Sequence, residues 1–165
     1  MQELTGKVRE SVHLSVLERN RLLVVAQQES PERVRLSIEV GGEFDPVATA
    51  SGRLLLAYAA DGVREQALSV SPTWRAMNNR ARTALAETLA EIRKTGTSFA
   101  ESETIEGVRD VAVLVGDPAS GVIAALAITR LVRRGQRGDE ATLVAAMRGA
   151  ARTITESLGW EGAAA

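Results

Sequence analysis

Residues 108–129, VRDVAVLVGDPASGVIAALAIT, decide the fold of this chain. They contain two runs rich in β-branched residues, 108–115 and 122–129, and such runs favour β-strands. The segment between them, GDPASG at residues 116–121, is made of residues that favour turns. The stretch therefore predicts an antiparallel β-hairpin.

The alternation of side chains within this hairpin predicts which residues share a face of the sheet. One face of the first strand carries Val108, Asp110, Ala112 and Leu114. The opposite face carries Arg109, Val111 and Val113. On the second strand the residues that point together are Ala125, Ala127 and Thr129. This pattern is consistent with a sheet that turns one side toward a pocket.

The N-terminal part of the chain predicts a second hairpin and a third strand. Residues 11–17 alternate between apolar and polar side chains, and a turn at 18–21 leads into an apolar run at 22–27. Pro31 interrupts that run because proline has no N–H for a ladder hydrogen bond. A further alternation at 34–38 predicts the third strand, which ends at Gly41 and Gly42.

Helical signals fill the rest of the chain. Residues 1–10 are expected to be the end of a linker helix. A helix through Tyr58 is capped either by Asp45, followed by Pro46, or by Thr49. Further helices are expected at 61–68 and at 81–92, with a loop at 71–79 between them and a stop at Gly96. A last helix, capped by Asp139, runs to Leu158.

Hairpins with helices between them predict an α+β fold with a mostly antiparallel sheet flanked by helices.

Composition and charge limit the possible functions. The chain has 165 residues, with 20 Lys and Arg against 21 Asp and Glu, and its net charge is −1. This balance lacks the basic excess of a DNA-binding domain, so we do not expect this segment to bind DNA alone. No apolar stretch is long enough for a bilayer, and the N-terminus does not have the pattern of a signal peptide. A single cytoplasmic domain that does not contact membrane is expected.

Catalytic and metal-binding patterns are weak. The chain has no cysteine and one histidine, His13. Ser11, His13 and Ser15 share a strand face, but residues two apart on a strand point in parallel, so a polar sheet face is the simpler interpretation. An acidic cluster and an arginine-rich segment are interpreted as solvated loops; they comprise Glu101, Glu103, Glu106 and Asp110, and Arg130, Arg133, Arg134 and Arg137. We therefore expect no catalytic residue, no metal and no cofactor.

One binding feature remains at the start of the first long helix. The N–H groups near Thr49, Ala50 and Ser51 lack partners within the helix, and they favour a small carboxylate or another polar acceptor. Gly41-Gly42 also precedes this helix, but the full Walker or dinucleotide pattern is missing. A sheet behind the helix would provide the floor of a pocket.

Several short motifs occur in the order typical of the IclR family of bacterial transcriptional regulators. They are ESVHL at 10–14, VGG at 40–42, ATASG at 48–52, Glu103, and GVR at 107–109. From about Leu4 to Leu158 the chain resembles the C-terminal effector-binding domain of that family. The resemblance implies a GAF-like fold over residues 11–160, with the family's N-terminal winged helix-turn-helix domain absent from this chain.

The resemblance also implies a function. Family members bind a small metabolite, often an organic or aromatic acid, and form homodimers or tetramers. Binding of the metabolite then changes DNA binding by the N-terminal domain through coupling between the two sites. The alternative is a free-standing GAF-like sensor that acts through a partner protein.

Family pocket positions carry over to eight residues of this sequence. The apolar wall corresponds to Leu36 and Phe44, and the helix N-terminal donors correspond to Ala50 and Ser51. The positions on the sheet correspond to Ala100, Asp110, Ala127 and Thr129.

Three of the sheet positions depart from the family pattern. Ala100 replaces an acid and Ala127 replaces a hydroxyl, so a larger pocket and a bulkier effector are expected. Asp110 stands where cysteine is common, and its charge would favour an effector with a donor group. The alternative is that Asp110 meets water or pairs with Arg109 or Arg35.

Overall fold

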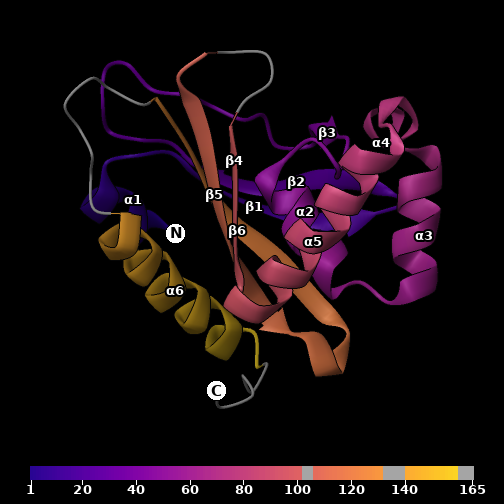
Figure 1. The fold of residues 1–165 in the computed structure, drawn as a ribbon. Helices are drawn as coiled ribbons and strands as arrows, with labels where there is room; N and C mark the ends of the chain where they lie inside the picture. Colours follow the sequence, from indigo (N-terminus) through magenta and orange to yellow (C-terminus); the bar gives the residue numbers. More distant parts are fainter. Residues whose placement is uncertain (102–105, 132–139, 160–165) are drawn as a thin grey trace.

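The computed structural model describes residues 1–101, 106–131 and 140–159, and it has one six-stranded sheet with helices on both faces (Figure 1). Among the residues named above, Glu103, Arg133, Arg134, Arg137 and Asp139 lie outside these ranges. The described elements in chain order are α1 (Gln2–Val8), β1 (Val12–Glu18), β2 (Arg21–Gln28), β3 (Glu43–Phe44), α2 (Ala50–Tyr58), α3 (Asp61–Val70), α4 (Pro72–Ala76), α5 (Asn79–Thr95), β4 (Thr97–Glu101), β5 (Val108–Asp117), the 3-10 turn η1 (Pro118–Ser120), β6 (Val122–Leu131) and α6 (Glu140–Ser157).

The sheet has the strand order β3-β2-β1-β6-β5-β4, and every neighbouring pair is antiparallel. The predicted hairpin is formed by β5 and β6, in which Asp110 lies opposite Thr129. Its turn requires glycine at Gly116, which has a φ of 94° and whose Cβ would lie 2.2 Å from the Val122 carbonyl oxygen. The α+β class and the antiparallel sheet are confirmed.

The third strand predicted at 34–38 is wrong. The edge of β2 pairs instead with β3, where Leu22 lies opposite Phe44. The backbone of the 34–38 segment is held by a side chain, because the Ile38 N–H donates to Gln27 Oε1 at 2.8 Å. The apolar side chains of Leu36 and Ile38 are half-buried, which explains the alternation that suggested a strand.

Two further differences concern residues 71–101. A short helix, α4, occupies part of the expected loop, and the Ser71 hydroxyl caps it by accepting from the Trp74 N–H at 3.0 Å. Strand β4 was not predicted; its partner is β5, and Ala100 lies opposite Asp110. Pairing with a distant strand determines β4, since its own sequence contains only one large apolar residue, Phe99.

Helix α2 begins as one of the two alternatives predicts. The Thr49 hydroxyl accepts from the Gly52 N–H at 3.1 Å and is therefore the cap. Asp45 has another role: its carboxylate accepts from the Val47 N–H, the Thr73 N–H and the Ser71 hydroxyl, and it thereby links the start of α2 to α4. The other predicted helices are present as α1, α3, α5 and α6, and Gly96 ends α5 in the left-handed conformation.

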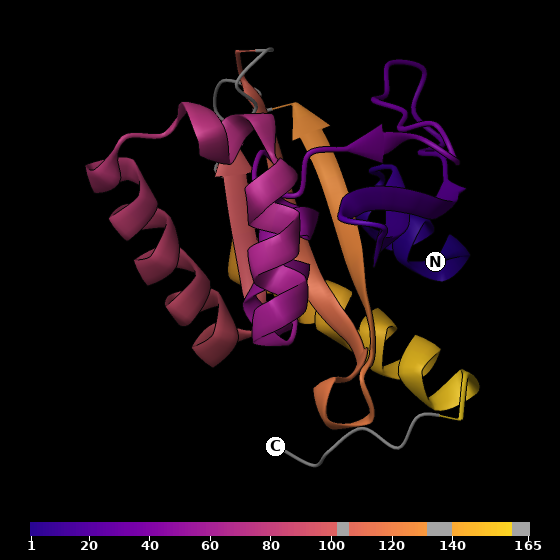
Figure 2. The same cartoon turned by 90° about the vertical axis from the view of Figure 1, so that its right-hand side faces the viewer.

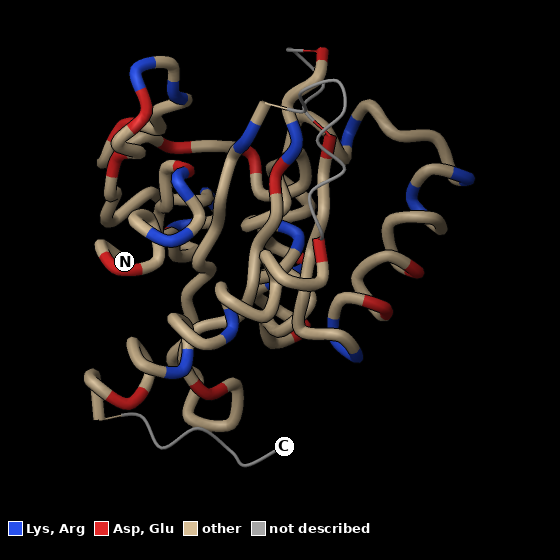
Figure 3. The backbone as a smooth tube through the Cα atoms, turned by 90° about the vertical axis from the view of Figure 1, so that its left-hand side faces the viewer, with Lys and Arg blue, Asp and Glu red and all other residues tan. Residues whose placement is uncertain are grey.

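The helices divide the core into two parts (Figure 2). On one face of the sheet α2 and α5 cover a layer that includes Leu54, Leu55 and Leu89. On the other face α6 and α1 cover a layer that includes Leu126, Ile128 and Met147. Along the described backbone, Lys and Arg alternate with Asp and Glu in several segments (Figure 3).

Candidate ligand-binding site

A cavity of about 440 Å³ lies between the sheet, the start of α2 and the 34–38 segment. We call it the sheet cavity. Most of its wall is aliphatic or aromatic, and a few polar groups converge on it, which is the usual composition of a small-molecule site. The described residues that line it are His13, Leu22, Val24, Leu36, Ser37, Ile38, Phe44, Ala48, Thr49, Ser51, Val108, Asp110 and Thr129.

The sheet contributes three polar side chains to the cavity, His13 from β1, Asp110 from β5 and Thr129 from β6. Asp110 and Thr129 are directly opposite in the β5–β6 ladder, and opposite residues of an antiparallel pair project from the same face. His13 lies opposite Ala127 on the other side of β6. Neighbouring central strands therefore place all three on one wall.

His13 is neutral at physiological pH. Its residue is only 7% exposed, and burial lowers the pKa of the imidazole to about 4 because desolvation penalises the charged form. A neutral imidazole has one donor and one acceptor nitrogen. His13 therefore offers the cavity hydrogen-bonding groups without a positive charge.

Asp110 is in an unfavourable place for a carboxylate. Burial raises its pKa, and the nearby Thr129 hydroxyl acts in the opposite direction. Its Oδ1 is buried and receives no hydrogen bond from the described residues. The ion pairs suggested as an alternative are not formed, because Arg109 binds Glu101 and Glu140 while Arg35 binds Glu29. Asp110 thus lines the cavity without a basic partner among the residues that the structure describes.

The first turn of α2 forms a second polar part of the wall. Thr49 and Ser51 line the cavity, and the Thr49 hydroxyl is already engaged with the Gly52 N–H. The N–H groups at the start of any helix lack intrahelical acceptors and carry a partial positive charge. This end of α2 can therefore stabilise a carboxylate or another acceptor.

Five of the eight residues carried over from the family line the sheet cavity: Leu36, Phe44, Ser51, Asp110 and Thr129. The other three, Ala50, Ala100 and Ala127, are buried in the core layer beneath α2 and α5 and do not line it. The expectation that Ala100 and Ala127 enlarge the pocket directly has no support from this geometry. For all eight residues, a contact with ligand stays a prediction.

Seven of the lining residues were not predicted to bind a ligand from the sequence, whereas Thr49 was predicted as part of the helix start. Two of them carry a usable signal, since Val108 shares a strand face with Asp110, and His13 lies on the polar face of residues 11–17. The others depend on the path of the chain around β2 and the start of α2. They are Leu22, Val24, Ser37, Ile38 and Ala48.

The described residues show no arrangement typical of catalysis or metal binding. The Ser11 hydroxyl accepts from the Ser30 N–H at 3.1 Å, and Ser15 Oγ is buried with no hydrogen-bond partner in the described part of the chain. No group of three or more His, Cys, Asp or Glu in the described ranges is suited to hold a metal ion. Likewise, none of the described helices is long and apolar enough to cross a membrane.

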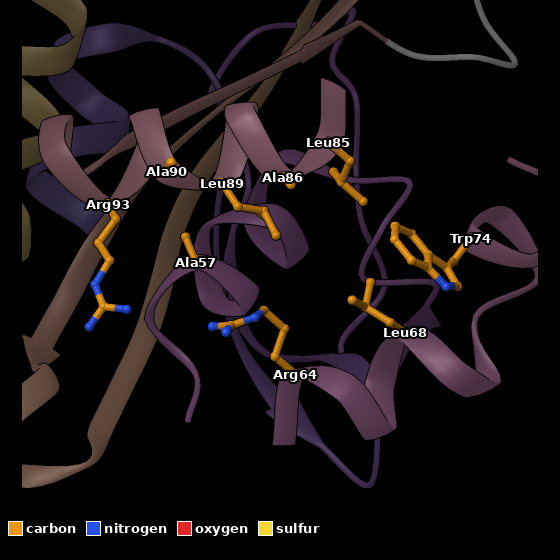
Figure 4. A pocket seen from close by; sticks show the side chains of 9 residues that line it. All are labelled: Ala57, Arg64, Leu68, Trp74, Leu85, Ala86, Leu89, Ala90 and Arg93. Carbon is orange, nitrogen blue, oxygen red and sulfur yellow. The ribbon is translucent and has the colours of Figure 1, made fainter. Parts of the chain in front are cut away.

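A second cavity of about 320 Å³, which we call the helical cavity, lies among α2, α3, α4 and α5 (Figure 4). Its polar groups are less available than those of the sheet cavity. Arg64 already binds the Ala59 carbonyl oxygen and Asp61, and Arg93 lies at the exposed end opposite Trp74. The remaining lining residues are Ala57, Leu68, Leu85, Ala86, Leu89 and Ala90. The sheet cavity is therefore the stronger candidate.

Comparisons with known proteins agree with this architecture. Residues 1–156 match the family model described as "Bacterial transcriptional regulator IclR C-terminal". The glycerol operon regulatory protein of Streptomyces coelicolor is 32% identical over 164 residues, which are 95% of this chain and 63% of that protein. The chain spans about half to two thirds of the length of the curated relatives it matches.

Two solved structures extend the likeness to the fold. The C-terminal domain of the Escherichia coli regulator KdgR is 28% identical with a TM-score of 0.76, over 97% of this chain and 94% of that one. An IclR homolog from Microbacterium hydrocarbonoxydans, solved with 4-hydroxybenzoate, is 30% identical with a TM-score of 0.77, over 96% and 64%. The GAF-like arrangement is confirmed. The chain belongs to the IclR family of bacterial transcriptional regulators and forms the C-terminal domain of such a regulator.

Proposed function

We propose that this domain senses a small organic or aromatic acid, or a related metabolite, by binding it in the sheet cavity. The observation that carries the proposal is one cavity in which the polar wall formed by His13, Asp110 and Thr129 meets the first turn of α2. Apolar side chains such as Leu36 and Phe44 surround these groups and would exclude water from a bound molecule. The 4-hydroxybenzoate bound to the homolog from M. hydrocarbonoxydans supports a ligand of this size and type.

The proposed output is regulation of transcription. In the full-length regulator, occupancy of the cavity would change DNA binding by an N-terminal winged helix-turn-helix domain. A ligand shifts such an equilibrium only by as much as its affinities for the two states differ. We further propose that the regulator is a homodimer or tetramer, which light scattering of the purified protein would test. No catalytic step is proposed, since the curated relatives are regulators.

Thermal unfolding in the presence of small organic acids tests this proposal. A ligand that binds only the native state raises the melting temperature by mass action. Ala48 lines the sheet cavity and is half-buried, so Ala48→Leu is expected to occupy part of the cavity and to remove the shift. Ala90→Leu makes the same change in the helical cavity and is expected to leave the shift intact. Loss of the shift in Ala90→Leu alone would overturn the assignment.

A further inference from the structure

We propose that the ligand of the sheet cavity carries a hydrogen-bond donor, a hydroxyl or an amine, at the end that lies against the sheet, and that Asp110 is its acceptor. This inference rests on the proposed function and adds the orientation and chemical class of the ligand. An acidic group, if the ligand has one, lies at the other end, beside the first turn of α2.

The first step is the unmet need of the Asp110 carboxylate. A buried carboxylate is stable only when several donors surround it, because it has about four lone-pair positions to satisfy. Asp110 has the Thr129 hydroxyl beside it, while its Oδ1 is buried and has no donor among the described residues. Native proteins rarely leave a buried polar atom without a hydrogen-bond partner. A donor on a ligand would supply the missing interaction.

The second step is the charge around Asp110. Of the described residues that line the sheet cavity, none is lysine or arginine, and His13 is neutral. The two arginines nearest in the hairpin ladder, Arg109 and Arg130, both bind Glu140 on α6. A ligand carboxylate placed against Asp110 would therefore meet a like charge with no described cation to offset it.

The third step is the difference between the two polar parts of the wall. The sheet wall holds an acceptor, Asp110, together with a hydroxyl and a neutral imidazole. The start of α2 holds backbone donors and a partial positive charge. A ligand with a donor at one end and an acceptor at the other satisfies both parts at once, whereas a molecule with acceptors at both ends satisfies only one.

Two sets of matched probes test this orientation. The aromatic set is benzoate, 4-hydroxybenzoate, 4-(aminomethyl)benzoate and terephthalate, and the aliphatic set is butyrate, 4-hydroxybutyrate, 4-aminobutyrate and succinate. Every probe keeps one carboxylate, and the four members of a set differ only in the group at the far end. The first member has no polar group there, and the others have a hydroxyl, an amine or a second carboxylate. Dissociation constants are measured by calorimetry on the domain. The hydroxyl and amine probes distinguish a neutral from a cationic donor.

The expected result is a preference of about tenfold or more for a donor probe over its unsubstituted parent, as a hydrogen bond to a charged group provides. The dicarboxylate is expected to bind more weakly than the parent. In Asp110→Asn the dicarboxylate should bind more tightly than it does to the wild type, and the donor preference should shrink. A gain of binding cannot arise from a misfolded variant.

The matched control is Asp117→Asn on the same strand. Asp117 caps η1 through the Ala119 N–H at 2.9 Å and does not line the sheet cavity, and asparagine can keep that cap. This variant should retain the wild-type preferences.

Two results would overturn the inference in different ways. Equal binding of parent, donor and dicarboxylate probes, unchanged in Asp110→Asn, would refute the role of Asp110 and leave the proposed function standing. Binding of none of the eight probes would contradict the proposed acid-sensing function, and the inference would fall with it.

Discussion

The two faces of the central sheet are built from the same strands but are packed in different ways. On the face covered by α6, the buried strand residues other than Ala124 are large and branched: Val12, Val111, Val113, Val115, Leu126 and Ile128. On the face covered by α2, many of the buried strand residues are small or polar, namely His13, Ser15, Ala112, Ala125, Ala127 and Thr129, while the large residues Leu22, Val24 and Val108 line the sheet cavity. The sheet cavity lies on the second face.

This difference shows how one sheet can serve stability and binding together. Side chains alternate between faces, so each strand can place large residues on one side without filling the other. The α6 face is closely packed, while short and polar side chains on the α2 face leave room for a ligand. Changes on the first face should therefore affect mainly stability, and changes on the second should affect pH dependence and binding.

The largest effect is expected from truncation on the α6 face. Leu126 is fully buried there, so Leu126→Ala should lower the free energy of unfolding by about 3 kcal/mol through lost burial and the void it leaves. Leu36→Ala on the sheet cavity removes a half-buried side chain and should cost less than half as much. Urea unfolding measures both. Equal costs would remove the proposed contrast between the faces.

A comparable effect is expected from acid, through His13. Its folded pKa of about 4 lies below the unfolded value of 6.5, so the unfolded state binds the proton more readily. The stability that neutral His13 provides is full above pH 6.5 and is lost as the pH falls toward 4, by about 3 kcal/mol.

The variant His13→Gln isolates this contribution, since the other titrating groups, Asp110 included, are present in both proteins. The difference in unfolding free energy between wild type and variant should change across pH 6.5 to 4 and be constant above it. Urea unfolding at a series of pH values measures it. A difference that is flat throughout would show that His13 is not buried in neutral form.

A smaller effect is expected at the start of α2. Thr49→Ala removes the cap on the Gly52 N–H and should lower the free energy of unfolding by about 1 kcal/mol. It should also weaken binding of any ligand that stabilises the wild type, because the first turn of α2 lines the sheet cavity. Thr88→Ala makes the same change on the exposed side of α5, where the hydroxyl donates to the Ala84 carbonyl. This variant should keep both the free energy of unfolding and the ligand affinity of the wild type.

The smallest effect has the opposite sign. Asp110→Asn removes a partly buried charge that has no basic partner in the described ranges, so the free energy of unfolding at pH 8 should rise by on the order of 1 kcal/mol. Because the pKa of Asp110 is raised in the folded state, the wild type recovers this stability as the pH falls, and the gain should shrink in acid. Asp117→Asn serves again as the control. A loss of stability at pH 8 would indicate that the carboxylate is satisfied in the folded protein.

Local patterns predicted much of the fold because they reflect local physics. The alternation at 108–115 and 122–129 determined a hairpin and its faces, and Gly96 marked the end of a helix. Strand β4 was missed because it forms by pairing with β5, and residues 97–101 alone carry no strand pattern. The alternation of Leu36 and Ile38 was misread because they face the sheet cavity while the backbone binds Gln27 instead of a strand.

Residues of the candidate site could be predicted only where the family resemblance or the strand alternation identified them. Asp110 and Thr129 came from both, and Ser51 came from the resemblance and from the helix start. His13 was interpreted as part of a polar sheet face, because its burial depends on α2 and the 34–38 segment folding over it. Ala50, Ala100 and Ala127 show the reverse: their positions correspond to the family pocket, yet they pack within the core.

The central claim is that a small molecule binds between the α2 face of the sheet and the first turn of α2. The most direct test is a two-dimensional NMR titration of the isotope-labelled domain with the probe that binds most tightly. The account predicts that the amide signals of His13, Ser51 and Asp110 shift together and saturate at the same dissociation constant, while those of Arg64, Leu68 and Ala90 stay in place. Saturable shifts at the helical cavity, with the sheet-cavity signals unchanged, would contradict it.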